Sequence, residues 1–303
     1  MSKPIVVVGS INMDLVAHAH RIPVPGESFV GTAFDTTPGG KGANQAVAIA
    51  RLGHPVQMVG MVGEDVFGQA LLDNLTGAGV ETSAVQRVPG PSGVASILIA
   101  DSGENAIVVV PGANGKVDPA TVDRHADLIR SAGMVLCQLE LPMETVSRTL
   151  ALCAEAGVPV VLDPAPAANL PDDLWSQVAW FTPNETEAEF YCGQKVSPEI
   201  GARRLLARGL KGVVLKRGAQ GAYVAVAGGN AAWVDPFPVE AVDTVGAGDC
   251  FNGAFAVALL QGRHPWAAAW QASAAAAISV TRHGAQASMP SRADVEAFLA
   301  EHS

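Results

Sequence analysis

The chain has 303 residues, of which 49% are hydrophobic and 16% charged, so it is long enough to bury a large α/β core. Its formal net charge of -10, without a lysine- or arginine-rich block, argues against a partner that is nucleic acid or an anionic membrane. The four cysteines show no C-x-x-C spacing, which argues against a zinc site or a disulfide framework.

The start of the chain predicts a soluble, cytoplasmic protein with no membrane partner. The first apolar run, Ile5–Gly9, is too short for a signal peptide and lacks a cleavage pattern. No apolar stretch in the chain approaches the ~18 residues that a membrane-spanning helix requires.

Short β-branched runs alternate with helix-like stretches along the chain, which is typical of βαβ units. The runs are apolar throughout instead of alternating, which indicates strands buried on both faces. We therefore predict an α/β fold with a mostly parallel central sheet flanked by helices, and ligands at the carboxyl ends of its strands. The predicted strands are Ile5–Gly9, Val56–Gly60, Met134–Gln138, Val158–Asp163, Trp180–Pro183 and Val213–Lys216.

Two segments break this pattern, at about 13–38 and 92–111. The second contains the runs Val94–Ala100 and Ile107–Val110, joined by a polar turn, and reads as a pair of antiparallel strands. We predict that both segments form a small β-sheet lid on a single domain that spans residues 1–303. Because each lies beside a candidate ligand segment, the lid would cover the site.

The first candidate ligand residues are Asn12 and Asp14, which follow the first strand. At a spacing of two, their side chains lie on the same side of an extended chain and could bind vicinal hydroxyls of a sugar. An Asx turn that ends the strand is the alternative. Further along, His18 and His20 have the spacing of a metal pair, but no third ligand lies nearby, which favours surface histidines.

A glycine-rich segment, Pro38–Gln45, precedes a predicted helix over Ala46–Leu52. Lys41 could reach a phosphate or a hydroxyl, and Asn44 could face the same ligand. Gly42 stands where a Walker motif would have Ser or Thr, so the segment is not a P-loop. No G-x-G-x-x-G follows the first strand, which removes the main support for a dinucleotide-dependent oxidoreductase.

Further polar residues follow later strands. Glu140 comes just after the predicted strand that ends at Gln138, at an edge where ligands bind, or else is a solvated loop acid. Asn184 and Glu187 have the spacing of a magnesium-phosphate contact and equally that of a capping box. The turn over Lys216–Gly221 predicts a hairpin with a nucleotide against one side.

The most informative segment is Asp243–Asp249, a strand-like run and glycine turn ahead of a predicted helix over Cys250–Leu260. Glycine removes side chains so that backbone N–H groups at a helix start can approach phosphate. Asp249 would repel that phosphate, so we interpret it as a base, with an ordinary pKa near ~3.9, that activates a hydroxyl. Helix capping by Asp249 is the alternative. Two glycine-rich sites suggest two ligands and phosphoryl transfer to an alcohol.

These motifs, taken in order, resemble the ribokinase-like carbohydrate kinase family over essentially the whole chain. The segments that carry the resemblance are Gly9–Asp14, Pro38–Gln45, Pro111–Asn114, Asp163–Pro166, Thr182–Glu185, Asp243–Asp249 and Arg282–Gln286. The resemblance implies ATP-dependent phosphorylation of the ribose O5 hydroxyl. It also leaves open deoxyribose, fructose, a keto-deoxy acid or a nucleoside as the acceptor, or a sugar sensor without catalysis.

The resemblance also implies roles for individual residues, with Mg²⁺ and a monovalent cation, usually K⁺, as cofactors. Its catalytic base is Asp249, beside an anion hole at Gly246, Ala247 and Gly248. The implied sugar contacts are Asn12, Asp14, Gly40, Lys41, Asn44, Glu140 and Asp249. The implied nucleotide contacts are Asn184, Lys216, Gly218, Gly221, Gly248 and Ser273, with Glu187 associated with magnesium. The implied monovalent-cation positions, mostly backbone carbonyls, are Asp243, Val245, Ser279, Arg282, Gly284 and Ser288.

The family further implies a homodimer formed through the lid. Two residues depart from its usual pattern. Asp163 stands where Asn is frequent, and Lys216 stands where a small hydroxyl residue is common. We expect Lys216 to alter nucleotide affinity.

Overall fold

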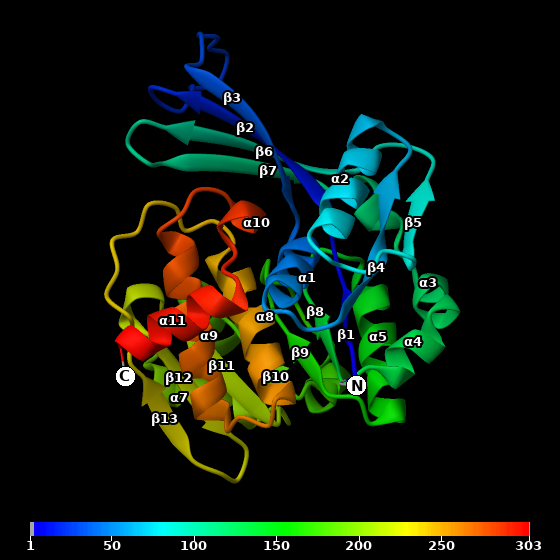
Figure 1. The fold of residues 1–303 in the computed structure, drawn as a ribbon, viewed down its shortest axis with the longest axis vertical. Helices are drawn as coiled ribbons and strands as arrows, with labels where there is room; N and C mark the ends of the chain where they lie inside the picture. The colour runs from blue at the N-terminus through cyan, green and yellow to red at the C-terminus, as the bar shows by residue number, and fades with distance from the viewer. Residues whose placement is uncertain (1–2, 303) are drawn as a thin grey trace.

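The computed structural model describes residues 3–302 and is built around a nine-stranded sheet (Figure 1). The strand order is β13-β12-β11-β10-β9-β8-β1-β4-β5, in which β12 and β13 are antiparallel to their neighbours and all other pairs are parallel. The strands are β1 (Ile5–Val8), β4 (Val56–Gly63), β5 (Val85–Val88), β8 (Met134–Cys137), β9 (Val160–Leu162), β10 (Trp180–Phe181), β11 (Gly212–Lys216), β12 (Ala222–Val226) and β13 (Ala231–Val234). The predicted parallel sheet is confirmed.

Helices cover both faces of this sheet, because its strands present apolar side chains to both. In β1, Ile5 and Val7 belong to one buried cluster, while Val6 and Val8 belong to the other, and none of the four is exposed. One layer contains α1 (Lys41–Arg51), α2 (Val66–Gly77), α8 (Ala247–Leu260), α9 (Pro265–Val280) and α11 (Arg292–Glu301). The other contains α3 (Pro119–Arg124), α4 (Ala126–Ser131), α5 (Met143–Ala156), α6 (Glu185–Cys192) and α7 (Pro198–Leu206).

A second, four-stranded sheet stands beyond the carboxyl end of the large one (Figure 1). Its order is β3-β2-β6-β7. The strands are β2 (Asn12–Ala19), β3 (Ala33–Gly39), β6 (Gly93–Ala100) and β7 (Asn105–Val110). Both predicted lid segments supply strands, but the central pair β2 and β6 is parallel, where only antiparallel strands were expected. The two segments come from separate crossovers, so local turn signals could not indicate how they pair.

Three boundaries near the glycine motifs differ from the prediction. The helices expected at Ala46 and Cys250 begin earlier, at Lys41 and Ala247, so glycine-rich sequence forms their first turns. The strand-like run before the second motif is irregular between the end of β13 at Val234 and Gly246. In a local pattern, glycines indicate a loop and valines a strand at these positions. Packing against the sheet instead decides where the helices begin and whether a strand forms.

The cysteines are all free, and three of them are buried, whereas Cys192 is half-buried. Among residues 3–302, no helix combines the length and apolar character needed to cross a membrane.

Candidate active site

The site lies at the carboxyl ends of β1, β8 and β9, where the strand order reverses. The chain runs outward from β1 through β4 on one side and through β8 on the other. Such a switch point leaves a crevice between the loops that follow neighbouring strands. Asn12, Glu140 and Asp163 all come shortly after these strands, and so they face one region.

Asp249 lies at the third residue of α8 and is 5% exposed. Its two carboxylate oxygens accept hydrogen bonds from Asn44 Nδ2 at 2.9 Å and Gln45 Nε2 at 3.1 Å. The helix N-cap is Gly246, whose φ of 76° suits glycine, so the capping alternative for Asp249 is wrong. The two glycine-rich segments therefore meet at one carboxylate.

Burial raises the pKa of the Asp249 carboxyl above its ordinary range. The Lys41 ammonium opposes this shift of the pKa, the Asp163 charge adds to it, and the two amide hydrogen bonds oppose it. The expectation of an ordinary pKa is therefore wrong for this site, because the sequence does not show how deeply α8 buries its first turn. A raised pKa makes Asp249 a stronger proton acceptor than a solvated aspartate.

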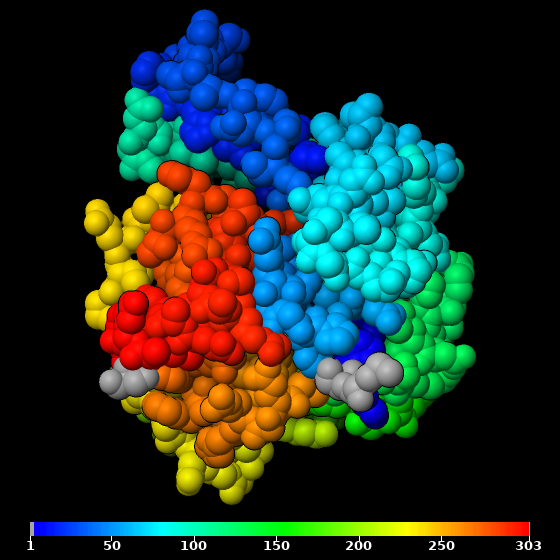
Figure 2. Space-filling model, viewed as in Figure 1, coloured from blue at the N-terminus to red at the C-terminus, as the bar shows by residue number. Residues whose placement is uncertain are grey.

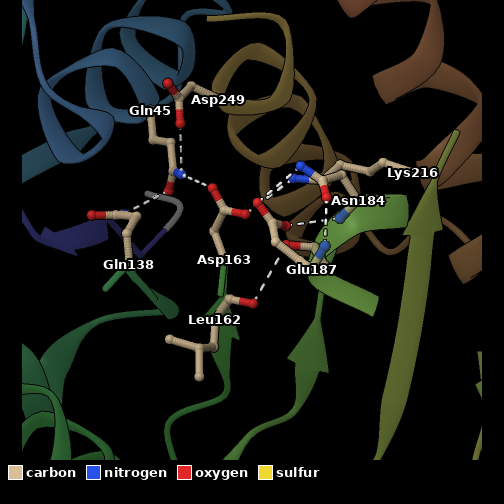
Figure 3. A network of polar contacts seen from close by, with 9 residues as sticks. Gln45, Gln138, Leu162, Asp163, Asn184, Glu187, Lys216 and Asp249 are labelled. Atoms are coloured by element: carbon tan, nitrogen blue, oxygen red, sulfur yellow. Dashed lines mark hydrogen bonds and ion pairs between the residues drawn. The ribbon is translucent and has the colours of Figure 1, made fainter. Parts of the chain in front are cut away.

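Gln45 connects Asp249 to a second buried acid, as Figure 3 shows. Its Nε2 donates to Asp163 Oδ2 at 3.0 Å as well as to Asp249, and its Oε1 accepts from Gln138 Nε2 at 2.7 Å. The contact from Gln138 fixes which end of the Gln45 amide faces the acids. Sequence reasoning missed Gln45 as a functional residue, although it ends the Pro38–Gln45 motif.

Asn44 is held in the same way from the other side. Its Oδ1 accepts from Gln286 Nε2 at 3.0 Å, and Gln286 Oε1 accepts from Asn74 Nδ2 at 2.6 Å. Since Asn44 is 6% exposed, this contact sets the orientation of the amide that donates to Asp249. Gln286 was seen in the sequence only as part of a motif, without this role.

The predicted sugar contacts lie beside this cluster. Glu140 Oε2 accepts from the Lys41 backbone N–H at 3.1 Å and from the Ser10 hydroxyl. Asn12 is 3% exposed, and its Oδ1 accepts from Asn114 Nδ2 at 2.6 Å. Of the groups expected to bind a sugar at Asn12, the amide oxygen is thus already engaged within the protein. Ser10 and Asn114 were seen in the sequence only as parts of motifs, without this supporting role.

Gly40 allows two of these segments to approach closely. It is the N-cap of α1 with φ of 89°, and a Cβ there would lie 2.7 Å from the Asn12 backbone nitrogen. Only glycine fits both constraints. The approach places the first turn of α1 against the start of β2, and so brings Lys41 beside the lid.

Electrostatics couples the same residues. Burial, together with the charges of Glu140 and Asp249, raises the pKa of Asp14 to about 7. Burial lowers the pKa of Lys41, but four carboxylates, Asp249 and Asp163 foremost, outweigh burial and hold this pKa above its ordinary value. The site therefore holds the Lys41 cation among several carboxyl groups whose mutual repulsion disfavours simultaneous ionisation.

A cleft of about 530 Å³ opens next to the Asp249 end of this cluster. Its lining includes all of the residues expected to bind nucleotide, which are Asn184, Lys216, Gly218, Gly221, Gly248 and Ser273. The lining also includes apolar residues that sequence reasoning did not identify, among them Phe251, Ala276 and Val280. A lining with both charged and apolar residues suits a ligand that carries phosphates and a base.

Asn184 and Glu187 form a complete capping box at the start of α6. Glu187 Oε2 accepts from the Asn184 backbone N–H at 2.8 Å, its Oε1 accepts from Asn184 Nδ2 at 2.9 Å, and Asn184 Oδ1 accepts from the Glu187 N–H. Burial raises the pKa of Glu187, while the Lys216 charge opposes that rise. The capping-box interpretation is thus confirmed, and the same two residues line the cleft in which the magnesium-phosphate contact is expected.

The residues expected around a monovalent cation lie in two segments, one before α8 and one that runs from the last turn of α9 to Ser288. Asp243 links the segments, since Oδ1 accepts from the Val245 N–H at 3.0 Å and Oδ2 from the Gly284 N–H at 2.8 Å. Ser279 and Ser288 are buried, and each donates its hydroxyl to a nearby carbonyl, which leaves the oxygen lone pairs as acceptors. The Arg282 side chain turns away to Asp294.

The histidine pair does not form a metal site. His18 pairs with Asp35 at 3.5 Å and His20 with Asp101 at 2.7 Å, both on the lid surface. Nowhere in residues 3–302 do three or more His, Cys, Asp or Glu side chains form a metal-binding cluster.

Residues 2–292 match the model of the pfkB family carbohydrate kinases. The chain belongs to that family. It is 44% identical to the ribokinase of Bacillus subtilis over 97% of this chain and 99% of that one. It is 37% identical to the deoxyribokinase of Salmonella typhimurium over 97% of this chain and 98% of the other.

Solved structures of the family have the same fold. The structure of Arabidopsis thaliana ribokinase complexed with ribose and ATP aligns with a TM-score of 0.93, at 35% identity and 99% coverage of both chains. The ribokinase from Thermotoga maritima aligns with a TM-score of 0.91, at 38% identity and 98% and 99% coverage of this chain and that one. These matches confirm the predicted α/β fold with its smaller second sheet.

Proposed function

We propose that this pfkB carbohydrate kinase transfers the γ-phosphoryl group of ATP to O5 of D-ribose and releases D-ribose 5-phosphate and ADP. The observation that carries the proposal is the placement of Asp249. It is a buried carboxylate at the first turn of α8, between the polar cluster beside the lid and the 530 Å³ cleft. The ribokinases among the similar proteins support ribose as the acceptor.

In the proposed mechanism, the chain's own groups position the reactants and the proton. Asp14 and Asn12 hold sugar hydroxyls, and Asp249 accepts the O5 proton as the new bond to phosphorus forms. The N–H groups of residues 246–249 and the α8 dipole stabilise negative charge on the transferred group. Asn44 and Gln45 keep both oxygens of Asp249 oriented throughout.

The donor atoms suit the two proposed cations. Three acids line the cleft, Asp163, Glu187 and Asp249, and carboxylate oxygens are ligands that Mg²⁺ prefers. Because both Glu187 oxygens already accept from Asn184, Glu187 would act through water. When bound, Mg²⁺ neutralises charge on the phosphates. The joined loops at Asp243 and Gly284 offer carbonyl and hydroxyl oxygens for K⁺, with Val245, Ser279, Arg282 and Ser288 as the other proposed positions.

We also propose that the protein is a cytoplasmic homodimer that pairs through its lid. All of β7 is exposed, including Ile107, Val108, Val109 and Val110 at 49–64%. In Figure 2 the lid projects beyond the rest of the molecule. An apolar edge strand of this kind is a liability for an isolated molecule. Domain organisation is proposed as one unit, 1–303, that carries this lid.

A 2-deoxyribose kinase is the second candidate, because the deoxyribokinase relative is as similar to this chain as several ribokinases are. The two functions differ in whether a buried group of the site pairs with the 2-hydroxyl. A site built around that hydroxyl discriminates strongly against a sugar that lacks it.

The test measures ADP release from Mg-ATP by the purified protein with D-ribose, 2-deoxyribose, fructose and adenosine, each with and without K⁺. We expect K⁺-stimulated turnover that is fastest with ribose. Faster turnover of another acceptor would identify that acceptor as the substrate and leave the proposed mechanism unchanged. No turnover with any acceptor, despite sugar binding, would show that the protein is a sensor and not a kinase.

A further inference from the structure

One buried ion pair lies inside the nucleotide cleft. Lys216 Nζ is 3.0 Å from Asp163 Oδ1, and the two side chains are 13% and 3% exposed. In each other ion pair within residues 3–302, at least one side chain is 40% or more exposed. Burying two charges is costly, so such a pair at a ligand site calls for a functional explanation.

The fold places this pair at the entrance to the phosphate site. Lys216 ends β11 and Asp163 follows β9, so the pair bridges across β10 at the carboxyl edge of the sheet. A Cβ on Gly248 would lie 3.4 Å from Lys216 Nζ. The ammonium group therefore lies between Asp163 and the first turn of α8, where the backbone N–H groups are proposed to hold phosphate.

The ammonium group has donors to offer a ligand. A lysine has three N–H donors, and within residues 3–302 the described hydrogen bonds of Lys216 Nζ use one of them, to Asp163. Both Lys216 and Gly248 line the cleft. A polyphosphate held against Gly248 comes within reach of the remaining donors, and hydrogen bonds between charged groups are strong.

Asp163 also contacts Gln45, the residue that orients the proposed base Asp249. Its Oδ2 accepts from Gln45 Nε2 at 3.0 Å, and the same nitrogen donates to Asp249 Oδ1 at 3.1 Å (Figure 3). Its backbone N–H is tied to the end of β8 through the Cys137 carbonyl at 2.9 Å. One rigidly held carboxylate thus fixes both Lys216 and Gln45.

We propose that Lys216 binds the terminal phosphates of the nucleotide and that Asp163 is the positioning residue that holds and partly neutralises it. The proposal rests on the proposed kinase function, because it requires a nucleoside polyphosphate in the cleft. Asp163 gives Lys216 a competing partner, so the cation attracts the phosphates without retaining the product ADP. Through Gln45, the same acid aligns this cation with the base Asp249.

The test measures the affinity for AMP, ADP and a non-hydrolysable ATP analogue by calorimetry, without sugar. Lys216→Met is expected to weaken binding of the ATP analogue about 10- to 100-fold and of AMP less than about twofold, since AMP lacks the terminal phosphates. Asp163→Asn is expected to tighten ADP binding several-fold and to lower kcat, because product leaves more slowly. Lys211→Met, at the residue before β11, is the matched control and is expected to change none of these values.

Lys216→Met leaves Asp163 buried without its partner, so that variant could fail to fold. The double variant Asp163→Asn with Lys216→Met removes both charges and is expected to show the same selective loss for the ATP analogue. An equal loss for AMP, or unchanged affinity for the ATP analogue in the folded double variant, would overturn the proposal. If the unmodified protein binds no ATP analogue, the kinase function falls as well. If it binds the analogue normally and only the selective loss is missing, the kinase function stands.

Discussion

Beside the cleft, Asp249, Asn44 and Gln45 are at most 6% exposed, and each of them is hydrogen-bonded to another side chain. In the lid, every residue of β7 is exposed, including four successive apolar residues, Ile107 to Val110. These polar side chains are thus held in place by one another. The outer strand of the lid, in contrast, leaves apolar side chains exposed. Within the lid, the proposed chemistry and the proposed assembly involve different strands, because Asn12 and Asp14 lie on β2 whereas the exposed apolar residues lie on β7.

The largest effect is expected from a substitution of Asp249. Asp249→Asn removes the proton acceptor and sets an amide against the donors of Asn44 and Gln45, so kcat is expected to fall about 10²- to 10⁴-fold. Ribose binding is expected to persist, because other residues hold the sugar. Steady-state kinetics and calorimetry with ribose check both expectations.

Asp127→Asn is the matched control for this change, since Asp127 is exposed on α4, and it should leave kcat unaltered. Turnover of the Asp249 variant within about threefold of the unmodified protein would remove Asp249 from the role of base.

The lid is tested by placing a charge on its outer strand. Val109→Asp is expected to weaken self-association at least about 100-fold, because a carboxylate in an apolar interface stays unpaired and loses its water. Sedimentation equilibrium over a range of concentrations measures the change. Val66→Asp alters a residue of α2 that is 81% exposed and should leave the association unaffected. A monomer before any substitution would contradict assembly through the lid.

Gln286 tests whether the cleft depends on its supporting amides. Gln286→Leu leaves Asn44 Oδ1 and Asn74 Nδ2 without their partner, and the free energy of unfolding is expected to fall by about 1–3 kcal/mol. A drop in kcat should accompany it, since Asn44 then orients Asp249 less well. Urea unfolding and kinetics measure the two effects. Gln69→Leu, at an exposed glutamine on α2, is the control.

Asp14 gives the smallest effect and connects the cleft with the lid. Its pKa is raised from 3.8 to about 7, so the folded protein binds this proton more tightly than the unfolded chain does. Protonated Asp14 therefore stabilises the folded protein at acidic pH, and this contribution to the free energy of unfolding is lost as the pH rises through about 7. Asp14→Asn should remove that loss, measured by urea unfolding at a series of pH values.

Sugar binding should show the opposite dependence. An ionised Asp14 accepts hydrogen bonds from hydroxyls, so the KM for ribose is expected to rise up to about tenfold for each unit that the pH falls below that pKa. In Asp14→Asn this dependence should disappear. An unmodified protein with a flat profile between pH 6 and 8 would show that Asp14 does not titrate in the free enzyme.

Much of the architecture could be predicted from the sequence alone. Apolar runs such as Ile5–Gly9 specify strands buried on both faces, because every side chain in them must leave water. Polar residues directly after those runs, such as Asn12 and Glu140, are then brought to one edge by the parallel arrangement. The glycine motifs predict helices that approach a ligand closely, although these helices begin at Lys41 and Ala247 and not at Ala46 and Cys250 as expected.

The tertiary structure alone decided which distant residues touch. Asn44 and Asp249 are 205 positions apart, and Asp163 and Lys216 are 53 apart, and no local pattern records such pairs. It also decided the pKa of Asp249, because burial is set by the whole packed layer of α1 and α8 and not by the neighbours of Asp249 in the chain. Chain-local chemistry selects strands, turns and reactive groups, whereas their hydrogen-bond partners and charge states arise only when separate segments exclude water from the same space.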